Sequence, residues 1–367
     1  MLWKTVARTT SLEPGSRFLP LILTSVMACA ATVSAQTNVA SGRTKAVRWV
    51  TLYAGGPTNL TPLYPAYTVP ELVRYISFVD TAGRPTAWLT SGAIFLNLFS
   101  GAHHLFATWM PMATRHADGA DWEAYIDSLV SPGGPTARLD SAIAQVATIL
   151  GPPRARFRIA VMIPYPDPTG DSLRFLGTTY RLGDPQDRAN LAVAYSREFV
   201  ARYGKTRFPN LQLDGLYWLK EDVPPQDSTV LPRVAAAVRK LGVRFIWVPS
   251  YHRAASAWKR WGFDEAWLQP NYFFDPKLAV GRLDSAVVQA RAADMGMEIE
   301  FNRKLLTDSV FARRLDPYLA TLTGAADLQS RSVVMFDGAG GLLDLSGSKD
   351  PRYVVLYKKL AEVLRQP

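Results

Sequence analysis

The chain has 367 residues, enough for one large domain or two small ones, with 48% hydrophobic and 20% charged residues. This balance is typical of a globular protein and excludes a disordered one. The formal net charge is +10, but lysine and arginine are scattered without a basic run, so we expect no nucleic-acid partner. Cys29 is the single cysteine, which excludes an internal disulfide and a thiolate metal site.

The first 35 residues have the pattern of a signal peptide. Basic residues accompany an apolar run at 18–31 that is too short to cross a bilayer comfortably, and a small-x-small cleavage site ends at Ala35. An alternative cut precedes Cys29, because residues 26–29 are close to a lipobox. We therefore expect export to the periplasm or the extracellular space, with a membrane-anchored lipoprotein as the alternative. Membrane contact is expected only if Cys29 carries a lipid.

Residues 36–46 are expected to form a linker and residues 47–367 a single domain. In that domain, strand-like stretches alternate with helical patterns. We predict eight strands, at 48–53, within 87–99, and at 157–163, 211–219, 244–248, 266–269, 297–301 and 332–336. Helices are predicted at 70–80, 121–129, 137–150, 187–203, 231–241, 254–261, 283–294, 309–322 and 353–364. This α/β alternation predicts a closed (β/α)₈ TIM barrel, with a doubly wound open sheet as the runner-up.

Several common sites are not indicated by the sequence. Gly55-Gly56-Pro57 after the first strand lacks the spacing of a phosphate-binding loop, and no cofactor is expected. No GxSxG motif indicates a serine nucleophile. His103 and His104 are adjacent, so their side chains diverge, and no HExxH motif accompanies them. We predict no metal site.

The seventh expected strand alternates polar and apolar side chains. Glu298, Glu300 and Asn302 share one face, and Ile299 and Phe301 share the other. The apolar face is expected to meet the helices, which directs both glutamates into the barrel. Glu300 lies nearer the carboxyl end and is the candidate nucleophile, with Glu298 and Asn302 as supporting groups. The alternative is a structural ion pair with an arginine from a neighbouring strand.

The fourth expected strand offers Asp214 and Glu221. They are an odd number of residues apart, so a regular strand would point them to opposite faces, unless Gly215 marks a bulge that resets the phase. We expect Glu221 to act as general acid/base, with Asp214 in support. Tyr217 and Trp218 would give the acid an apolar surround and a wall for the sugar. The alternatives are a solvated Glu221 and an Asp214 that accepts hydrogen bonds from strand-end amides.

Polar and aromatic residues also gather at the ends of the other strands. These side chains could bond sugar hydroxyls or stack on a ring face: Tyr251, His252, Gln269, Asn271, Tyr272 and Asp337.

Four segments, at 213–221, at 245–251, at 258–264 with 269–273, and at 296–301, resemble the bacterial domain of unknown function numbered four-eight-five-five. The resemblance covers most of the chain and implies an exported protein with a glycoside-hydrolase-like barrel. Ser250 and residues 252–255 depart from the glycine-containing form of the family's segment after the fifth strand.

Two carboxyl groups facing one cleft are the requirement of glycosidic bond cleavage. An acid/base after strand four and a nucleophile on strand seven is also the arrangement of the largest clan of barrel glycosidases, although fold alone does not fix function. The sequence therefore predicts hydrolysis of a polysaccharide or oligosaccharide by Glu221 and Glu300. The alternative is a non-catalytic carbohydrate-binding barrel, with or without a lipid anchor.

Overall fold

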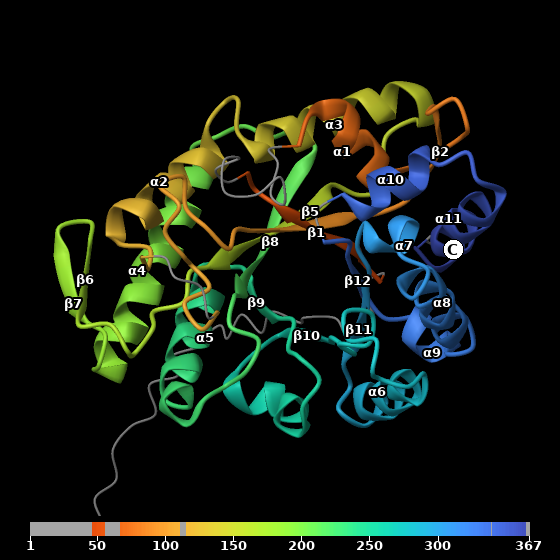
Figure 1. The fold of residues 1–367 in the computed structure, drawn as a ribbon. Coiled ribbons are helices and arrows are strands. Elements are labelled where there is room, and N and C mark those ends of the chain that lie inside the picture. The colour runs from red at the N-terminus through yellow and green to blue at the C-terminus, as the bar shows by residue number, and fades with distance from the viewer. Residues whose placement is uncertain (1–45, 56–66, 111–114, 339, 365–367) are drawn as a thin grey trace, which may run out of the picture. The chain divides into compact units, whose positions relative to one another are not determined.

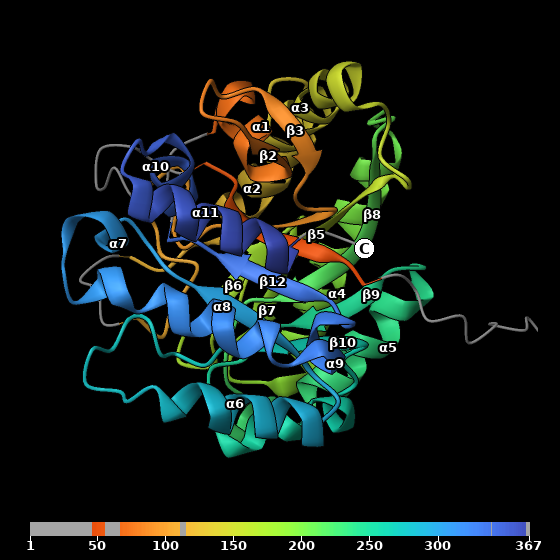
Figure 2. The ribbon, with the colours of Figure 1, turned by 90° about the vertical axis from the view of Figure 1, so that its right-hand side faces the viewer.

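Eight parallel strands close into a barrel (Figures 1 and 2). In spatial order they are β1 (Arg48–Tyr53), β4 (Gly92–Leu96), β5 (Phe157–Ile163), β8 (Leu211–Trp218), β9 (Arg244–Trp247), β10 (Glu265–Leu268), β11 (Gly296–Glu300) and β12 (Val333–Phe336). The last strand pairs with the first, so the sheet has no free edge. The predicted TIM barrel is confirmed.

We describe the protein from a computed structural model, which covers residues 46–55, 67–110, 115–338 and 340–364. The expected signal peptide, Cys29 and residues 36–45 of the expected linker lie outside the described residues. Within them, no helix combines the length and the apolar character needed to cross a bilayer.

Helices surround the strands and join one to the next (Figure 1). The longer ones are α1 (Val69–Ile76), α2 (Gly119–Val130), α3 (Pro135–Leu150), α4 (Pro185–Gly204), α5 (Val230–Lys240), α6 (Gly281–Ala292), α8 (Leu315–Thr323) and α11 (Pro351–Leu364). Shorter segments are α7 (Lys304–Thr307), α9 (Ala326–Gln329), α10 (Gly341–Gly347) and the 3₁₀ helices η1 (Pro225–Asp227), η2 (Arg253–Trp261) and η3 (Phe311–Arg313). Two hairpins, β2–β3 (Ser77–Val79, Pro85–Trp88) and β6–β7 (Ser172–Phe175, Thr178–Arg181), lie outside the barrel sheet.

Some predicted helices differ from the observed ones. The helix expected over 70–80 ends at Ile76, because Ser77 is already extended and begins β2. The segment expected as one helix at 309–322 is divided into η3 and α8. Pro317 lies in the first turn of α8, the one place in a helix where a missing N–H costs little.

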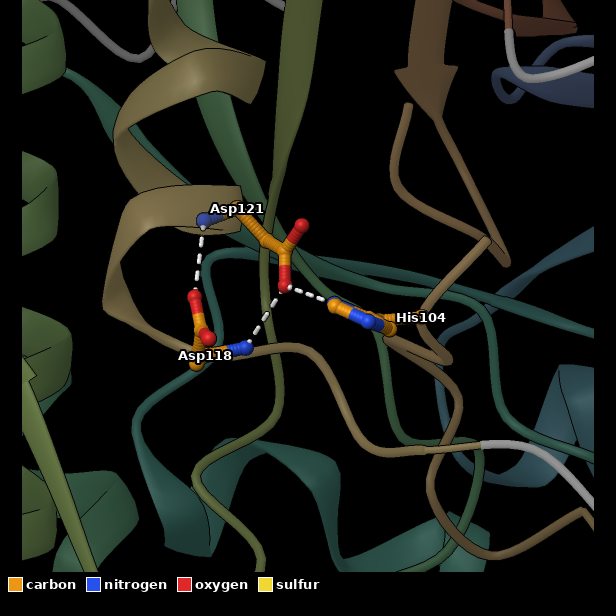
Figure 3. Close-up of side chains that lie close together, drawn as sticks. All are labelled: His104, Asp118 and Asp121. Carbon is orange, nitrogen blue, oxygen red and sulfur yellow. Dashed lines mark hydrogen bonds and ion pairs between the residues drawn. The ribbon is translucent and has the colours of Figure 1, made fainter. Parts of the chain in front are cut away.

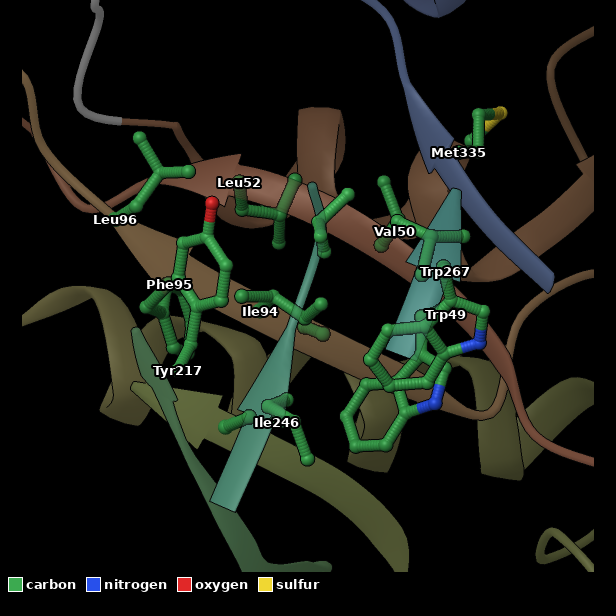
Figure 4. Packing of buried hydrophobic residues seen from close by; sticks show 14 of the residues in the cluster. Trp49, Val50, Leu52, Ile94, Phe95, Leu96, Tyr217, Ile246, Trp267 and Met335 are labelled. Atoms are coloured by element: carbon green, nitrogen blue, oxygen red, sulfur yellow. The ribbon is translucent and has the colours of Figure 1, made fainter. Parts of the chain in front are cut away.

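Buried side chains from several strands pack together in the barrel (Figure 4). Among them, Trp49 and Trp267 contact Gly92 and Gly296, the first residues of β4 and β11. The rings of Trp49 and Trp267 meet edge to face with centroids 5.9 Å apart. Gly92 and Gly296 make room for them, since a Cβ atom would lie 2.5 Å from the Trp49 ring at Gly92 and 2.3 Å from the Trp267 ring at Gly296. This end of the barrel is therefore packed core, which leaves the carboxyl end for a site.

Strand β8 carries a bulge. Leu213 pairs with Ile159 and Gly215 with Ala160, so Asp214 is the extra residue and the predicted change of phase beside Gly215 is observed. The sequence predicts that Asp214 supports Glu221, but in the structure Asp214 has other partners. It forms ion pairs with Arg158 (3.3 Å) and Arg244, which lie at the amino ends of β5 and β9. Asp214 thus belongs to the opposite end of the barrel.

Candidate active site

A cavity of about 260 Å³ opens at the carboxyl ends of the strands. Its walls are lined by Thr51, Tyr53, Ile94, Leu96, Leu98, Trp109, Met110, Tyr217, Leu219, Glu221, Val248, Gln269, Glu298 and Phe336. Among these described residues, two carry carboxyl groups and none carries a positive charge. A larger cavity of about 450 Å³ lies at the amino ends, beside Trp88 and Arg158, but a TIM barrel carries its chemistry at the carboxyl end.

Glu221 lies three residues beyond β8 and in phase with the two wall residues before it, Tyr217 and Leu219. The Ser250 hydroxyl donates a hydrogen bond of 2.5 Å to the Glu221 carboxylate, and the Ser250 N–H donates one of 3.2 Å to the Glu221 carbonyl oxygen. The loop after β9 therefore fixes both the backbone and the carboxylate of Glu221. The side chain is only half-buried and keeps contact with the cavity.

Glu298 is the more enclosed carboxyl group of the cavity. It is 4% exposed, and none of the residues that the structure describes donates a hydrogen bond to its carboxyl group. Burial raises the pKa of Glu298 well above its ordinary value, and the charges of Glu300 and Glu221 raise it further. Burial and the neighbouring carboxyl groups thus favour the protonated form of Glu298, which faces the cavity.

Glu300 is 1% exposed and is not among the residues of the cavity wall. Its carboxylate accepts a hydrogen bond of 2.6 Å from the Tyr318 hydroxyl and further bonds from the amides of Asn271 and Tyr272. Burial raises the pKa of Glu300 to about 7, against the opposing effect of these donors. The sequence predicts Glu300 as the group that meets the substrate, but in the structure Glu298 takes the place on the wall.

Gln269 lies on the wall, as expected, and its amide donates to the Val248 carbonyl oxygen at 2.8 Å. Asn271 has a φ of 52°, in the left-handed region. Its side chain accepts the Tyr251 N–H at 2.6 Å and donates to Gln269 at 3.3 Å. These bonds tie the loop after β10 to the loop after β9, so Asn271 shapes the site from behind the wall.

Three aromatic side chains expected at the rim pack against other groups. Tyr272 is covered by the Arg314 guanidinium, 3.7 Å from its ring centroid, and Tyr251 by Arg282 at 4.1 Å. The Nδ1 atom of His252 accepts the N–H of Ala255 at the start of η2. The ring proton therefore lies on Nε2, 3.4 Å from the Glu221 carbonyl oxygen. None of the three is part of the described wall.

Three further residues predicted for the site, Trp218, Asn302 and Asp337, contact other groups in the structure and are not part of the described wall. Trp218 is fully buried, with its ring edge-to-face against Tyr165 and Phe245, because it alternates with Tyr217 and points away from the cavity. Asn302 accepts the Lys304 N–H at the start of α7.

Asp337 is buried and accepts the Tyr75 hydroxyl at 2.7 Å and the amides of Gly340 and Leu342. It therefore fixes the start of α10, and Asn302 does the same for α7. Polar residues after barrel strands also begin the next helix, so a strand-end position alone does not identify a sugar contact.

Other wall residues do not stand out in the sequence as parts of a site. Tyr53 and Phe336 are the last residues of predicted strands, and their rings meet edge to face at 6.2 Å, so strand-end position was a usable signal. Trp109 comes from the long segment after β4. Tyr318 is not part of the wall and donates from α8 to Glu300. Nothing in the local sequence marks those two.

His104, Asp118 and Asp121 lie close enough together to hold a metal ion (Figure 3). The same atoms build the start of α2. Asp121 accepts the His104 ring N–H at 2.7 Å and the Asp118 amide at 2.8 Å, while Asp118 accepts the amides of Ala120 and Asp121. This capping box accounts for the arrangement. Burial acts to raise the pKa of Asp121, but hydrogen bonds from Asp118, Ser100 and His104 outweigh it and lower the pKa.

Comparison with known proteins supplies the family. The profile described as "Domain of unknown function (DUF4855)" matches residues 48–362. The chain belongs to this family. The resemblance stated from the four segments is thereby confirmed, and no match is found among curated proteins.

Solved structures similar to this DUF4855 protein include several glycoside hydrolases. An endo-β-1,4-glucanase from Xanthomonas axonopodis pv. citri has 12% identity and a TM-score of 0.45, over 87% of this chain and 100% of that one. A GH113 β-1,4-mannanase has 10% identity and a TM-score of 0.45, over 86% of this chain and 99% of that one. The catalytic domain of a family GH18 chitinase from the fern Peteris ryukyuensis has 9% identity and a TM-score of 0.44, over 87% of this chain and 100% of that one. At these values the similarity carries no argument about substrate or reaction.

Proposed function

We propose that this DUF4855 protein hydrolyses a glycosidic bond in a polysaccharide or oligosaccharide, with Glu221 and Glu298 as its two carboxyl groups. One observation carries the proposal: both side chains line the same cavity at the carboxyl end of the barrel. They come from β11 and from the segment after β8, two elements that are not neighbours in the barrel, which supports a sugar lying between them.

The two environments support different roles. Glu298 is desolvated and lies near two other carboxyl groups, both of which raise its pKa, and this suits the acid that protonates the leaving oxygen. Glu221 is half-buried and accepts a hydroxyl hydrogen bond, which suits the carboxylate that assists attack at the anomeric carbon. Glu300 contributes negative charge behind Glu298 and helps to keep the proton there.

The aromatic wall supports a sugar as the ligand. Tyr53, Trp109, Tyr217 and Phe336 surround the two carboxyl groups and offer flat apolar surfaces for the C–H face of a ring. The cavity is near the lower end of the roughly 300–1,000 Å³ that small-ligand sites occupy, so one sugar ring is the natural unit to fill it.

The decisive experiment measures reducing-sugar release from a broad polysaccharide and oligosaccharide panel by wild type and by Glu221→Gln, Glu298→Gln and Glu300→Gln. Glu362→Gln, an exposed helix position, is the matched control. We expect the first two variants to lose activity by about 10²–10⁴-fold, the usual contribution of acid–base groups. Glu300→Gln should keep reduced activity, and the control should equal wild type.

Two other outcomes would revise the proposal. If Glu300→Gln loses the hydrolytic activity and Glu298→Gln retains it, Glu300 is the reacting group. Glycan binding without release, unchanged in all variants, would identify a non-catalytic carbohydrate-binding barrel.

We also propose that the protein acts outside the cytoplasm after removal of residues 1–35, with lipidation at Cys29 as the alternative. The apolar run and the small residues before Gln36 support export. Mass spectrometry of the mature amino terminus separates a chain beginning at Gln36 from one beginning at a lipid-modified Cys29.

A further inference from the structure

Arg314, at the start of α8, is a buried cation that binds backbone rather than carboxylate. It is 7% exposed, and no carboxylate in the described part of the chain lies within ion-pair distance. Its guanidinium donates to the carbonyl oxygens of Tyr272, Asp275 (2.9 Å) and Leu278 (3.1 Å). All three acceptors belong to the loop between β10 and α6, so one side chain gathers that loop.

Tyr318 lies one helical turn further along α8, on the same face as Arg314. Its hydroxyl donates to Glu300 at 2.6 Å and accepts the Tyr272 N–H at 3.3 Å. Tyr272 is therefore held at its amide by Tyr318 and at its carbonyl and ring by Arg314. The loop and the Glu300 carboxylate are fixed by a single helix.

The loop adopts a backbone conformation that needs such support. Asn271 is in the left-handed region, where residues other than glycine are uncommon. The amides of Asn271 and Tyr272 lower the pKa of Glu300, so this effect depends on the loop staying in place. Asn271 is also bonded to Tyr251, so the loop is held from both sides.

We propose that Arg314 and Tyr318 are positioning residues, which clamp the β10–α6 loop over Glu300 and so fix the negative charge behind Glu298. The catalytic consequence rests on the function proposed above. The clamp itself does not, because it concerns the donors of Glu300 alone.

The first test is a carboxyl ¹³C NMR titration of the full chain with labelled glutamate, in wild type and Tyr318→Phe. The Glu300 signal is assigned by its absence in Glu300→Gln. Tyr318→Phe removes one oxygen and keeps the ring, so the fold should survive. We expect the Glu300 midpoint to rise by about one pH unit, the size of one hydrogen bond to a carboxylate. Tyr353→Phe, a half-buried tyrosine in the first turn of α11, is the control.

The second test uses Arg314→Lys, which keeps the charge but removes the guanidinium, whose Nη2 atom donates to the carbonyl groups of Tyr272, Asp275 and Leu278. We expect faster hydrogen exchange at the Asn271 and Tyr272 amides than in wild type and in Arg313→Lys, the exposed neighbour. A Glu300 midpoint unchanged in folded Tyr318→Phe, or exchange unchanged in Arg314→Lys, would overturn the clamp. Neither readout needs a substrate, so failure to find hydrolysis would count against the proposed function only.

Discussion

The Ser250 hydroxyl and the Glu221 carboxylate are joined by a hydrogen bond of 2.5 Å, and the same serine also donates its amide to the Glu221 carbonyl oxygen. Ser250 lies in the loop after β9, whereas Glu221 follows β8. Two neighbouring strands therefore set the orientation of one of the two carboxyl groups proposed to react.

Ser250→Ala should lower kcat/KM by about ten- to a hundredfold, because hydrogen bonds to charged groups contribute about 1.5–3 kcal/mol and each 1.4 kcal/mol is tenfold. The thermal midpoint should change little, since the serine is only partly buried. Steady-state kinetics on the substrate found in the panel measures the effect. Ser228→Ala, which removes an exposed hydroxyl bonded to Pro225, is the control. Equal kinetics in both variants would refute the orienting role.

Asp214→Asn should reduce stability and leave catalysis unchanged. The variant weakens the ion pairs to Arg158 and Arg244, for which we expect a loss of about 1–3 kcal/mol in the free energy of unfolding. Urea denaturation measures that loss, and kcat/KM should match wild type because Asp214 lies at the amino ends of the strands. A drop in kcat/KM in a well-folded Asp214→Asn protein would restore a catalytic role for this residue.

Glu300 should make the protein less stable as the pH rises toward neutrality. Its pKa is raised from 4.5 to about 7 on folding, so between these values the folded chain binds more protons than the unfolded one. Stability is then highest below the unfolded pKa and declines through the folded pKa. In Glu300→Gln the decline should be smaller by up to about 3 kcal/mol, at 1.36 kcal/mol for each pKa unit.

Urea denaturation between about pH 4.5 and about pH 7.5 measures this slope. Carboxylates whose pKa is lowered, such as Asp121, complete their titration below this range and do not interfere. Glu298 leaves a residual slope of the same sign in Glu300→Gln, since its pKa is raised as well. Parallel curves for wild type and Glu300→Gln would contradict the prediction, and Glu362→Gln should follow wild type.

Asp227→Asn should be among the most destabilising single changes. Asp227 and Arg188 are fully buried and form an ion pair, and the Tyr165 hydroxyl donates to Asp227 at 3.0 Å. Removing one charge leaves the other buried without its partner, which costs about 3–5 kcal/mol. The free energy of unfolding measures it. Asp316→Asn, from the exposed pair with Lys359, should leave stability unchanged. Similar stabilities for the two variants would show that the buried pair is not needed.

The barrel was predictable because each of its strands is short, apolar and bounded by turn residues. The strands β1 and β5 have the predicted limits, and the rest agree within one or two residues or lie within the predicted range, as β4 does. The hairpins β2–β3 and β6–β7 were not predicted, since their strands are only three or four residues long and partly exposed. Periodicity needs a longer window to distinguish such strands from loops.

The site was predictable in part. Alternation correctly separates Glu298 and Glu300 from Ile299 and Phe301, but it cannot decide which of two carboxyl groups on one face reaches a cavity. That choice depends on the loop after β10 and on Tyr318, which cover Glu300 from elements that are distant in the chain.

The bulge at Asp214 determines which charge enters the cavity. Lys220, Glu221 and Asp222 are consecutive, and only Glu221 is in phase with Tyr217 and Leu219. Lys220 and Asp222 bond to each other at 2.9 Å instead, with the ammonium group 4.6 Å from the centroid of the Trp109 ring. If one residue were inserted or deleted between the bulge and these three residues, the Lys220 ammonium or the Asp222 carboxylate would face the cavity in place of Glu221. The sign of the charge that this strand presents to the cavity therefore depends on the phase of side-chain alternation after the bulge as much as on the residue types.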